Sequence, residues 1–160
     1  MKTNLRSLLF LVLAGFAAQA GLANDAGKLL GTWRLASYEM EVQATGAKET
    51  PFGTNPTGFI LFGADGRMMV VLTAEGRKAP ASDQDRADLM KTLVAYTGLY
   101  RVEGDKWVTK VDVSGNPAWV GTEQARTFRL AGDRLQEMTA VMNRPDKGMV
   151  RFVLGWERVK

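Results

Sequence analysis

The sequence predicts an all-β domain, an eight-stranded up-and-down antiparallel barrel with one short α-helix between the third and fourth strands. Three observations lead to this prediction: short glycine-containing turns, strand-like runs between them, and one segment with helical periodicity instead. The turns at Gly63–Gly66, Glu103–Asp105 and Ala131–Asp133 each separate two such runs, which is typical of hairpins. Successive hairpins favour a closed barrel because closure removes the exposed strand edges.

Eight runs account for the strands of this barrel. Side chains on a strand alternate between its faces, so one face of each run is expected to line the interior. We interpret Trp33, Trp107 and Trp156 as core residues on these inward faces. In the fifth run, Val111 and Val113 are expected to point inward together with Trp107. The expected strands are Gly31–Val42, Gly58–Phe62, Arg67–Leu72, Tyr96–Val102, Lys106–Ser114, Glu123–Leu130, Arg134–Thr139 and Met149–Val159.

The segment Ala79–Val94 interrupts the strand pattern and predicts a helix. Ser82 is a favourable N-cap, and Asp83 and Asp85 follow in the first turn, where acidic side chains stabilise a helix. These acids lack the spacing of a calcium-binding loop, so no metal site is expected here. The helix is expected to lie across a barrel opening or against the outer wall. Its apolar residues at helical spacing are Ala87, Met90, Leu93 and Val94.

The first 23 residues have the pattern of a secretory signal peptide. Lys2 and Arg6 precede the apolar run Leu8–Ala18, and small residues then allow cleavage after Ala20 or Ala23. The apolar run is shorter than the roughly 20 residues of a membrane-spanning helix. We therefore expect a signal peptide at 1–23 and a single barrel domain at 24–160 that is periplasmic or secreted, with no integral membrane span after cleavage.

Composition excludes several classes of function. The chain has no histidine and no cysteine, which removes the usual general base, thiol chemistry and nearly every zinc site. Its net charge of +4 falls to +2 once Lys2 and Arg6 leave with the signal peptide, and its basic residues are dispersed. A nucleic-acid-binding surface needs a concentrated basic stripe, so no nucleic acid is expected as a partner. No cofactor is expected either.

The segment Asn116–Phe128, "NPAWVGTEQARTF", places an aromatic ring close to polar and charged side chains. Asn116 and Pro117 begin a turn, and Trp119 follows in the connection. On the next strand Gln124 and Arg126 share a face with Phe128, which is expected to point inward. An inward arginine is costly unless it is paired, so Arg126 requires an explanation.

Two interpretations of Arg126 remain open. In the structural one, Arg126 pairs with a carboxylate on a neighbouring strand, such as Asp112 or Glu137, and Trp119 caps the barrel end. In the functional one, polar side chains bind a polar or anionic group of a ligand, and aromatic side chains line the apolar part of the site. The candidate ligand-binding residues are Tyr100, Trp119, Gln124 and Arg126.

Four stretches together resemble a known family over nearly the whole mature chain. The chain is similar to the bacterial lipocalin-like domain proteins, within the calycin group of small ligand-binding barrels. This resemblance implies an up-and-down β-barrel with a central cavity. The stretches are "LLGTWRLASYE" at Leu29–Glu39, "PFGTNPTGFILFGADGRM" at Pro51–Met68, "NPAWVGTEQARTF" at Asn116–Phe128 and "GWERV" at Gly155–Val159.

The resemblance also implies roles for two residues. Gly31–Trp33 looks like the Gly-x-Trp that opens calycin barrels, in which an arginine from a late strand commonly stacks on the tryptophan and closes one end. Arg158 is the candidate for that arginine, so Trp33 and Arg158 are expected to be structural. Related domains often have histidine in the strand before the Asn-Pro turn, where this chain has Lys110 and Asp112, so a proton-transfer role of that histidine does not carry over.

Three functions follow as hypotheses. The first is an exported barrel that binds a small apolar or amphipathic molecule, since eight strands leave room for one small ligand or for side chains alone. The second is an isomerase- or cyclase-type enzyme with Glu123 or Asp112 as acid or base and Arg126 and Tyr100 as electrostatic partners. The third is an interaction module with a filled barrel and a docking helix at Ser82–Val94. The sequence leans away from an enzyme.

Overall fold

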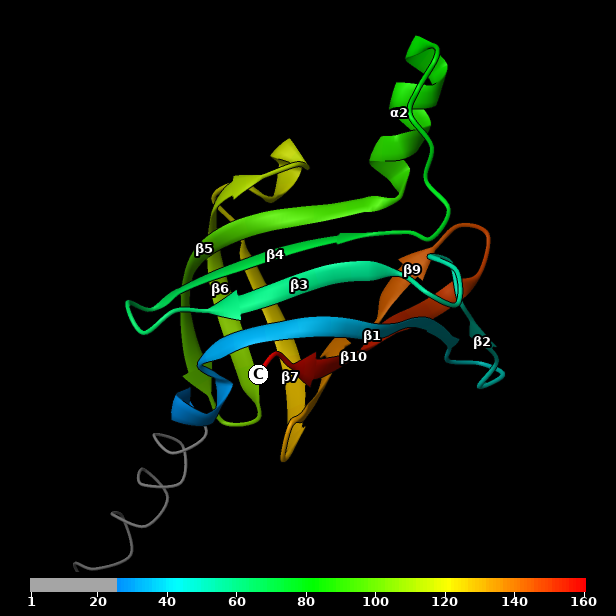
Figure 1. Cartoon of the computed structure of the whole chain (residues 1–160). Helices are drawn as coiled ribbons and strands as arrows, with labels where there is room; N and C mark the ends of the chain where they lie inside the picture. Colours follow the sequence, from blue (N-terminus) through cyan, green and yellow to red (C-terminus); the bar gives the residue numbers. More distant parts are fainter. Residues whose placement is uncertain (1–25) are drawn as a thin grey trace, which may run out of the picture.

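A computed structural model describes residues 26–160 of the chain (Figure 1). The predicted signal peptide at 1–23 lies outside the described residues. The strands are β1 (Gly31–Val42), β2 (Lys48–Glu49), β3 (Thr57–Phe62), β4 (Arg67–Thr73), β5 (Leu93–Glu103), β6 (Lys106–Ser114), β7 (Glu123–Ala131), β8 (Arg134–Thr139), β9 (Met142–Arg144) and β10 (Gly148–Arg158).

The predicted eight-stranded antiparallel barrel is confirmed. Hydrogen bonds join the strands in the order β2-β1-β3-β4-β5-β6-β7-β8-β10-β9, and β1 pairs with β10 as well, so the sheet closes on itself (Figure 1). Across this closure, Trp33 lies opposite Arg158 and Leu35 lies opposite Trp156. The short strands β2 and β9, which the sequence did not predict, lie at the two ends of that order, and the other eight strands form the barrel.

The barrel has two different ends. At the capped end lie the turns at 63–66, 104–105 and 132–133, the chain's helical turn before β1, and the end of β10. At the loop end lie the longer connections 43–56, 74–92, 115–122 and 140–147. One of these connections contains α2 (Asp83–Lys91), and another contains the short 3-10 helix η1 (Pro117–Trp119).

The helix α2 lies between β4 and β5, the third and fourth strands of the barrel, as predicted. Ser82 Oγ accepts a hydrogen bond from the Asp85 backbone N–H, and the Asp85 carboxylate accepts one from the Ser82 backbone N–H. This reciprocal cap explains why the helix begins there. The predicted end was wrong, because Leu93 and Val94 pair with β4 instead.

The predicted position of α2 was also wrong. The helix neither crosses an opening nor packs on the wall, since none of its residues is buried and it projects away from the barrel (Figure 1). An apolar residue such as Met90 is half exposed, so helical spacing alone did not indicate a buried face.

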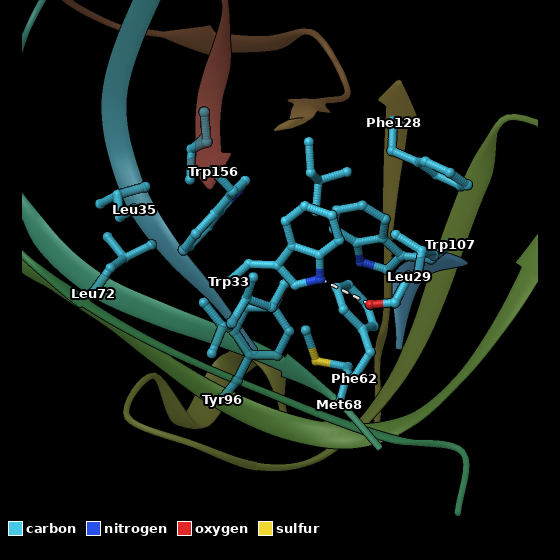
Figure 2. Close-up of a cluster of buried hydrophobic side chains, with 14 of the residues drawn as sticks. Leu29, Trp33, Leu35, Phe62, Met68, Leu72, Tyr96, Trp107, Phe128 and Trp156 are labelled. Atoms are coloured by element: carbon cyan, nitrogen blue, oxygen red, sulfur yellow. Dashed lines mark hydrogen bonds between the residues drawn. The ribbon is translucent and has the colours of Figure 1, made fainter. Parts of the chain in front are cut away.

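Aromatic side chains fill the barrel interior toward its capped end. Trp33, Trp107 and Trp156 are fully buried, as predicted, and gather with Phe62 and Met68 (Figure 2). Burial of each large aromatic side chain is a major stabilising contribution, because the apolar area removed from water is large. This half of the interior therefore consists of the protein's own side chains.

A bulge between Thr97 and Gly98 changes the alternation of β6. A Cβ atom at Gly98 would overlap the carbonyl oxygen of Lys110, so only glycine allows the two strands to approach there. Val111 faces inward on one side of this bulge, whereas Val113, on the other side, lies opposite Thr97 and is exposed. The prediction of an inward Val113 was therefore wrong.

Candidate functional site

The capped end is held by Arg158 and Trp33. Arg158 Cζ lies 4.0 Å from the centroid of the Trp33 ring, within the range of a cation–π contact. The guanidinium also donates hydrogen bonds to the backbone carbonyls of Leu30 and Lys28, and Trp33 Nε1 donates to the carbonyl of Leu29 at 2.8 Å. These contacts join the helical turn before β1 to the barrel.

Gly31 makes this arrangement possible. Its φ of 113° lies in the region that favours glycine, and a Cβ atom there would come within 3.3 Å of Arg158 Nη1. The Gly-x-Trp pattern at Gly31–Trp33 thus has a local physical reason: the glycine turns the chain sharply beneath the arginine, and the tryptophan enters the core.

A buried polar group lies further inside, between β7, β8 and β10. Arg126 Nε lies 3.1 Å from Glu137 Oε1, and the two side chains are only 12% and 6% exposed. Trp156 Nε1 donates to Glu137 Oε2 at 3.0 Å, and Arg126 Nη2 donates to Gln124 Oε1 at 3.2 Å. Of the two carboxylates proposed for Arg126, Glu137 was right and Asp112 was wrong.

Burial dominates the electrostatics of Glu137. Removal from water raises the pKa of its carboxyl above the usual range, while Arg126 and the Trp156 N–H act in the opposite direction. Glu137 lies directly opposite Phe128 and faces the interior. Its burial is tolerated because each of its carboxylate oxygens has a donor.

Five aromatic rings surround the loop end of the interior. Tyr38 stacks on Phe52, with ring centroids 4.4 Å apart, and also contacts Phe152. Tyr96 meets Trp119 edge to face at 5.7 Å. Trp119 and Phe152 are only partly buried, so the core is partly open to solvent here. We call these five residues the loop-end aromatic cluster.

Two tyrosines of this cluster adjoin the buried polar group. Burial raises the pKa of both Tyr38 and Tyr96 to about 12, Glu137 acts in the same direction, and Arg126 opposes it. Both hydroxyls therefore lie near enough to Arg126 and Glu137 for these charges to act on them, and Tyr96 is within hydrogen-bonding reach of Arg126. Sequence reasoning did not group Tyr38 or Phe52 with the site.

The structure brings three of the four predicted ligand-binding residues into this site. Gln124 and Arg126 contact each other, and Trp119 is linked to them through Tyr96. Tyr100 lies nearer the capped end, on β5 directly opposite Thr109. It stands four positions along β5 from Tyr96, about 13 Å at the rise of a strand, toward the capped end. There its ring packs edge to face on Phe62.

Two further buried polar atoms lie between this site and the capped end. Within the described chain, Trp107 Nε1 and Thr109 Oγ1 are buried and have no hydrogen-bond partner. Both belong to β6, where Trp107 lies opposite Arg126 and Thr109 lies opposite Gln124. Buried polar groups normally have a partner, which is often a water or a ligand atom.

The predicted catalytic carboxylates do not belong to the interior. Glu123 forms a two-point ion pair with Arg101, at 2.8 and 3.2 Å, and Asp112 pairs with Arg67 at 2.8 Å. All four side chains are well exposed. Neither carboxylate faces the site, so the structure contradicts their predicted role as acid or base in a cavity.

Two hollows lie at the capped end. The larger, of about 930 Å³, is lined by Phe128 and Leu130 together with charged side chains of both signs, including Asp105 and Arg158. The smaller, of about 250 Å³, includes Tyr100. Neither hollow contains the loop-end aromatic cluster, so they are separate from the candidate site.

No metal or membrane element was found in the part of the chain described. Residues 26–160 contain no group of three or more His, Cys, Asp or Glu side chains placed to hold a metal ion. In the same range, no helix is long and apolar enough to cross a bilayer.

Comparison with known proteins agrees with the barrel. A search of curated proteins finds no match to this chain. A family model described as a lipocalin-like domain matches residues 30–159, which is almost all of the described chain and includes both ends of the barrel. The chain therefore belongs to the lipocalin-like domain family.

Proposed function

We propose that this protein is an exported lipocalin-like barrel that binds a small apolar or amphipathic molecule in its interior, entered from the loop end. The apolar part of the ligand would contact the loop-end aromatic cluster. Its polar group would point toward Gln124 and Arg126. No cofactor takes part in this function.

The observation that carries the proposal is the set of unpartnered polar atoms inside an aromatic lining. Trp107 Nε1 offers a donor, and Thr109 Oγ1 offers a donor and an acceptor, directly across the ladder from Arg126 and Gln124. Small-molecule sites are mostly apolar with a few convergent polar groups, and this arrangement has that character.

The charge of the site favours a particular polar group. Glu137 already balances Arg126, so the interior has no net positive charge to attract a strongly charged ligand. A hydroxyl, carbonyl or carboxyl group fits the available donors, because each accepts hydrogen bonds without requiring a second buried cation. Trp119 and Phe152, both partly exposed, mark the side from which a ligand would enter.

Binding can be tested with N-phenyl-1-naphthylamine, a neutral aromatic amine that becomes fluorescent in apolar surroundings. We expect saturable binding to the mature protein, with quenching of tryptophan emission. Trp119→Ala and Gln124→Ala should each weaken it severalfold, because they remove lining groups without breaking the buried ion pair.

Met69→Ser is the matched control, since Met69 is exposed on the outer face of β4. It should leave the affinity unchanged. Absence of saturable binding, or equal weakening by Met69→Ser and Trp119→Ala, would refute a site at the loop end.

Export has an independent test. Expression of the full chain in a Gram-negative bacterium should give a periplasmic product whose intact mass corresponds to a chain beginning at Gly21 or Asn24. A full-length product in the cytoplasmic fraction would contradict the export proposal and leave the binding proposal untouched.

A further inference from the structure

The outer face of the barrel carries an unusual group of exposed apolar side chains. Six large residues on β3, β4, β5 and β6 point away from the interior and are between 43% and 63% exposed. We call this group the outer apolar wall. It consists of Phe59, Leu61, Met69, Val71, Leu99 and Val113.

The strand register makes these residues one surface. Phe59 lies directly opposite Val71, and Leu61 lies opposite Met69. Met69 is followed across the sheet by Thr97 and then by Val113. Directly opposed side chains on one face of a sheet are neighbours, so the four residues on β3 and β4 form one apolar patch. Leu99 and Val113 lie beside it, next to the Arg67–Asp112 ion pair.

The opposite wall of the same barrel differs. On β7 and β8 the outward positions include Thr127, Arg129, Arg134 and Gln136, which are polar or charged. Outward positions of a solvated antiparallel sheet are expected to be polar in this way. The barrel fold therefore does not require an apolar exterior, and the outer apolar wall calls for a separate explanation.

We propose that the outer apolar wall binds a second copy of this chain in a two-fold symmetric dimer. Six half-exposed large side chains present on the order of 600 Å² of apolar surface, at the upper limit for a patch left exposed on a monomer. A standard interface buries about 800 Å² on each partner, so the patch with a modest polar rim is large enough for one.

The charges at the rim suit self-association. Arg34 lies opposite Phe59 and pairs with Glu157, and Arg67 lies opposite Leu99 and pairs with Asp112. The Arg67–Asp112 pair crosses this face beside Thr97, and Lys110 lies opposite Leu99, so the face carries charges of both signs. Two copies related by a two-fold axis thus meet without net repulsion.

The same charges disfavour a lipid surface as the occupant. Membrane-docking faces combine apolar residues with unpaired Lys or Arg that attract anionic lipids. Here Arg34 and Arg67 are each neutralised by a carboxylate of the same chain, and the Lys110 ammonium, opposite Leu99, donates to the Gly121 carbonyl. A dimer through this wall also leaves the loop end open, so the inference stands independently of the proposed ligand site.

Sedimentation equilibrium of the mature protein tests the proposal. We expect a dimer at micromolar concentration and a melting temperature that rises with protein concentration. Met69→Glu, at the centre of the wall, should give a monomer with an unchanged circular dichroism spectrum. Gln136→Glu, which places the same charge on the opposite wall, should leave the dimer intact.

Leu99→Lys serves as a second variant if Met69→Glu does not fold. A wild-type chain that stays monomeric at on the order of 100 μM would overturn the proposal, because an interface of this size is then too weak to be occupied. A folded Met69→Glu or Leu99→Lys variant that remains dimeric would also overturn it. So would co-sedimentation of monomers with phosphatidylglycerol vesicles that Met69→Glu abolishes, since lipid would then be the occupant.

Discussion

The two ends of the barrel use arginine in different ways. At the capped end, Arg158 lies on the Trp33 ring and its N–H groups bind backbone carbonyls of the adjoining turn. Toward the loop end, Arg126 lies inside the barrel and is balanced by one buried carboxylate, Glu137. Arg158 therefore binds backbone groups of the adjoining turn. Arg126, in contrast, lies close to buried polar atoms that have no hydrogen-bond partner within residues 26–160.

This difference separates stability from binding. Trp33 is fully buried and its indole N–H has a partner, so the core behind the capped end is closely packed. Trp119 is partly exposed, and among the aromatic rings of residues 26–160 it contacts Tyr96 alone. Substitutions at the capped end should therefore reduce stability much more than equivalent substitutions at the loop end.

The largest expected effect is that of Trp33→Ala. It removes a fully buried ring, its hydrogen bond to Leu29 and its contact with Arg158, and should lower the free energy of unfolding by about 3–5 kcal/mol. Trp119→Ala should cost about 1 kcal/mol, because a partly exposed ring loses less on truncation. Urea unfolding of both variants measures the contrast, and equal losses would abolish the distinction between the ends.

Glu137→Gln should have the next largest effect. It leaves Arg126 buried without a counter-charge, which typically costs about 3 kcal/mol. Glu157→Gln is the matched control, because it removes the partner of Arg34 in an exposed ion pair and should cost less than about 1 kcal/mol. If thermal unfolding shows the two variants to be equally stable, the Arg126–Glu137 pair does not have the buried character described.

Alkaline pH should destabilise the fold, because two tyrosines are buried with raised pKa values. Tyr38 and Tyr96 keep their protons up to a pKa of about 12 when folded, whereas an unfolded tyrosine loses its proton near pH 10. Unfolding therefore releases protons between these values, and the free energy of unfolding should fall as pH rises from about 10 to about 12. Each tyrosine should contribute on the order of 3 kcal/mol to this fall.

Tyrosinate absorbance and urea unfolding at alkaline pH measure this dependence. Tyr38→Phe removes one of the two titrating groups, so its stability should fall less steeply with pH than that of the wild type. Parallel curves for the two proteins would show that the Tyr38 hydroxyl is not buried as described.

The smallest expected effect is that of Arg158→Lys. An ammonium group retains the charge over Trp33 but cannot bind the two carbonyls and the ring face together, so a loss of about 1–2 kcal/mol is expected. Arg34→Lys, in an exposed pair, should change stability by less than about 0.5 kcal/mol. An Arg158→Lys melting temperature equal to that of Arg34→Lys would contradict a closing role for the guanidinium.

The fold could be predicted because turns and alternation are local signals. Glycine turns and strand-like runs indicated all eight barrel strands, and the Ser82 cap indicated the start of α2. The alternation of inward and outward side chains did not predict the correct face where a bulge shifts the strand register. The irregularity between Leu35 and Ser37 concealed that Tyr38 faces inward, and the bulge at Gly98 turned Val113 outward.

The site could be predicted only in part, because alternation gives the face of a residue but not its height in the barrel. Tyr100 shares a face with Tyr96, yet it lies near the other end. The sequence left two carboxylates open as the partner of Arg126. The pairing of β7 with β8 in the structure identifies Glu137 as that partner. Phe52 comes from a connection without periodicity, so no pattern could place it against Tyr38.

The central claim is that the loop end receives a ligand while the capped end remains fixed. The most direct test records the indole N–H signals of the four tryptophans by NMR while the protein is titrated with laurate, an amphipathic carboxylic acid. We predict that the Trp119 signal shifts progressively to saturation and that the Trp33 signal does not move. A shift confined to Trp33, or no shift of Trp119 at saturating laurate, would contradict the assignment.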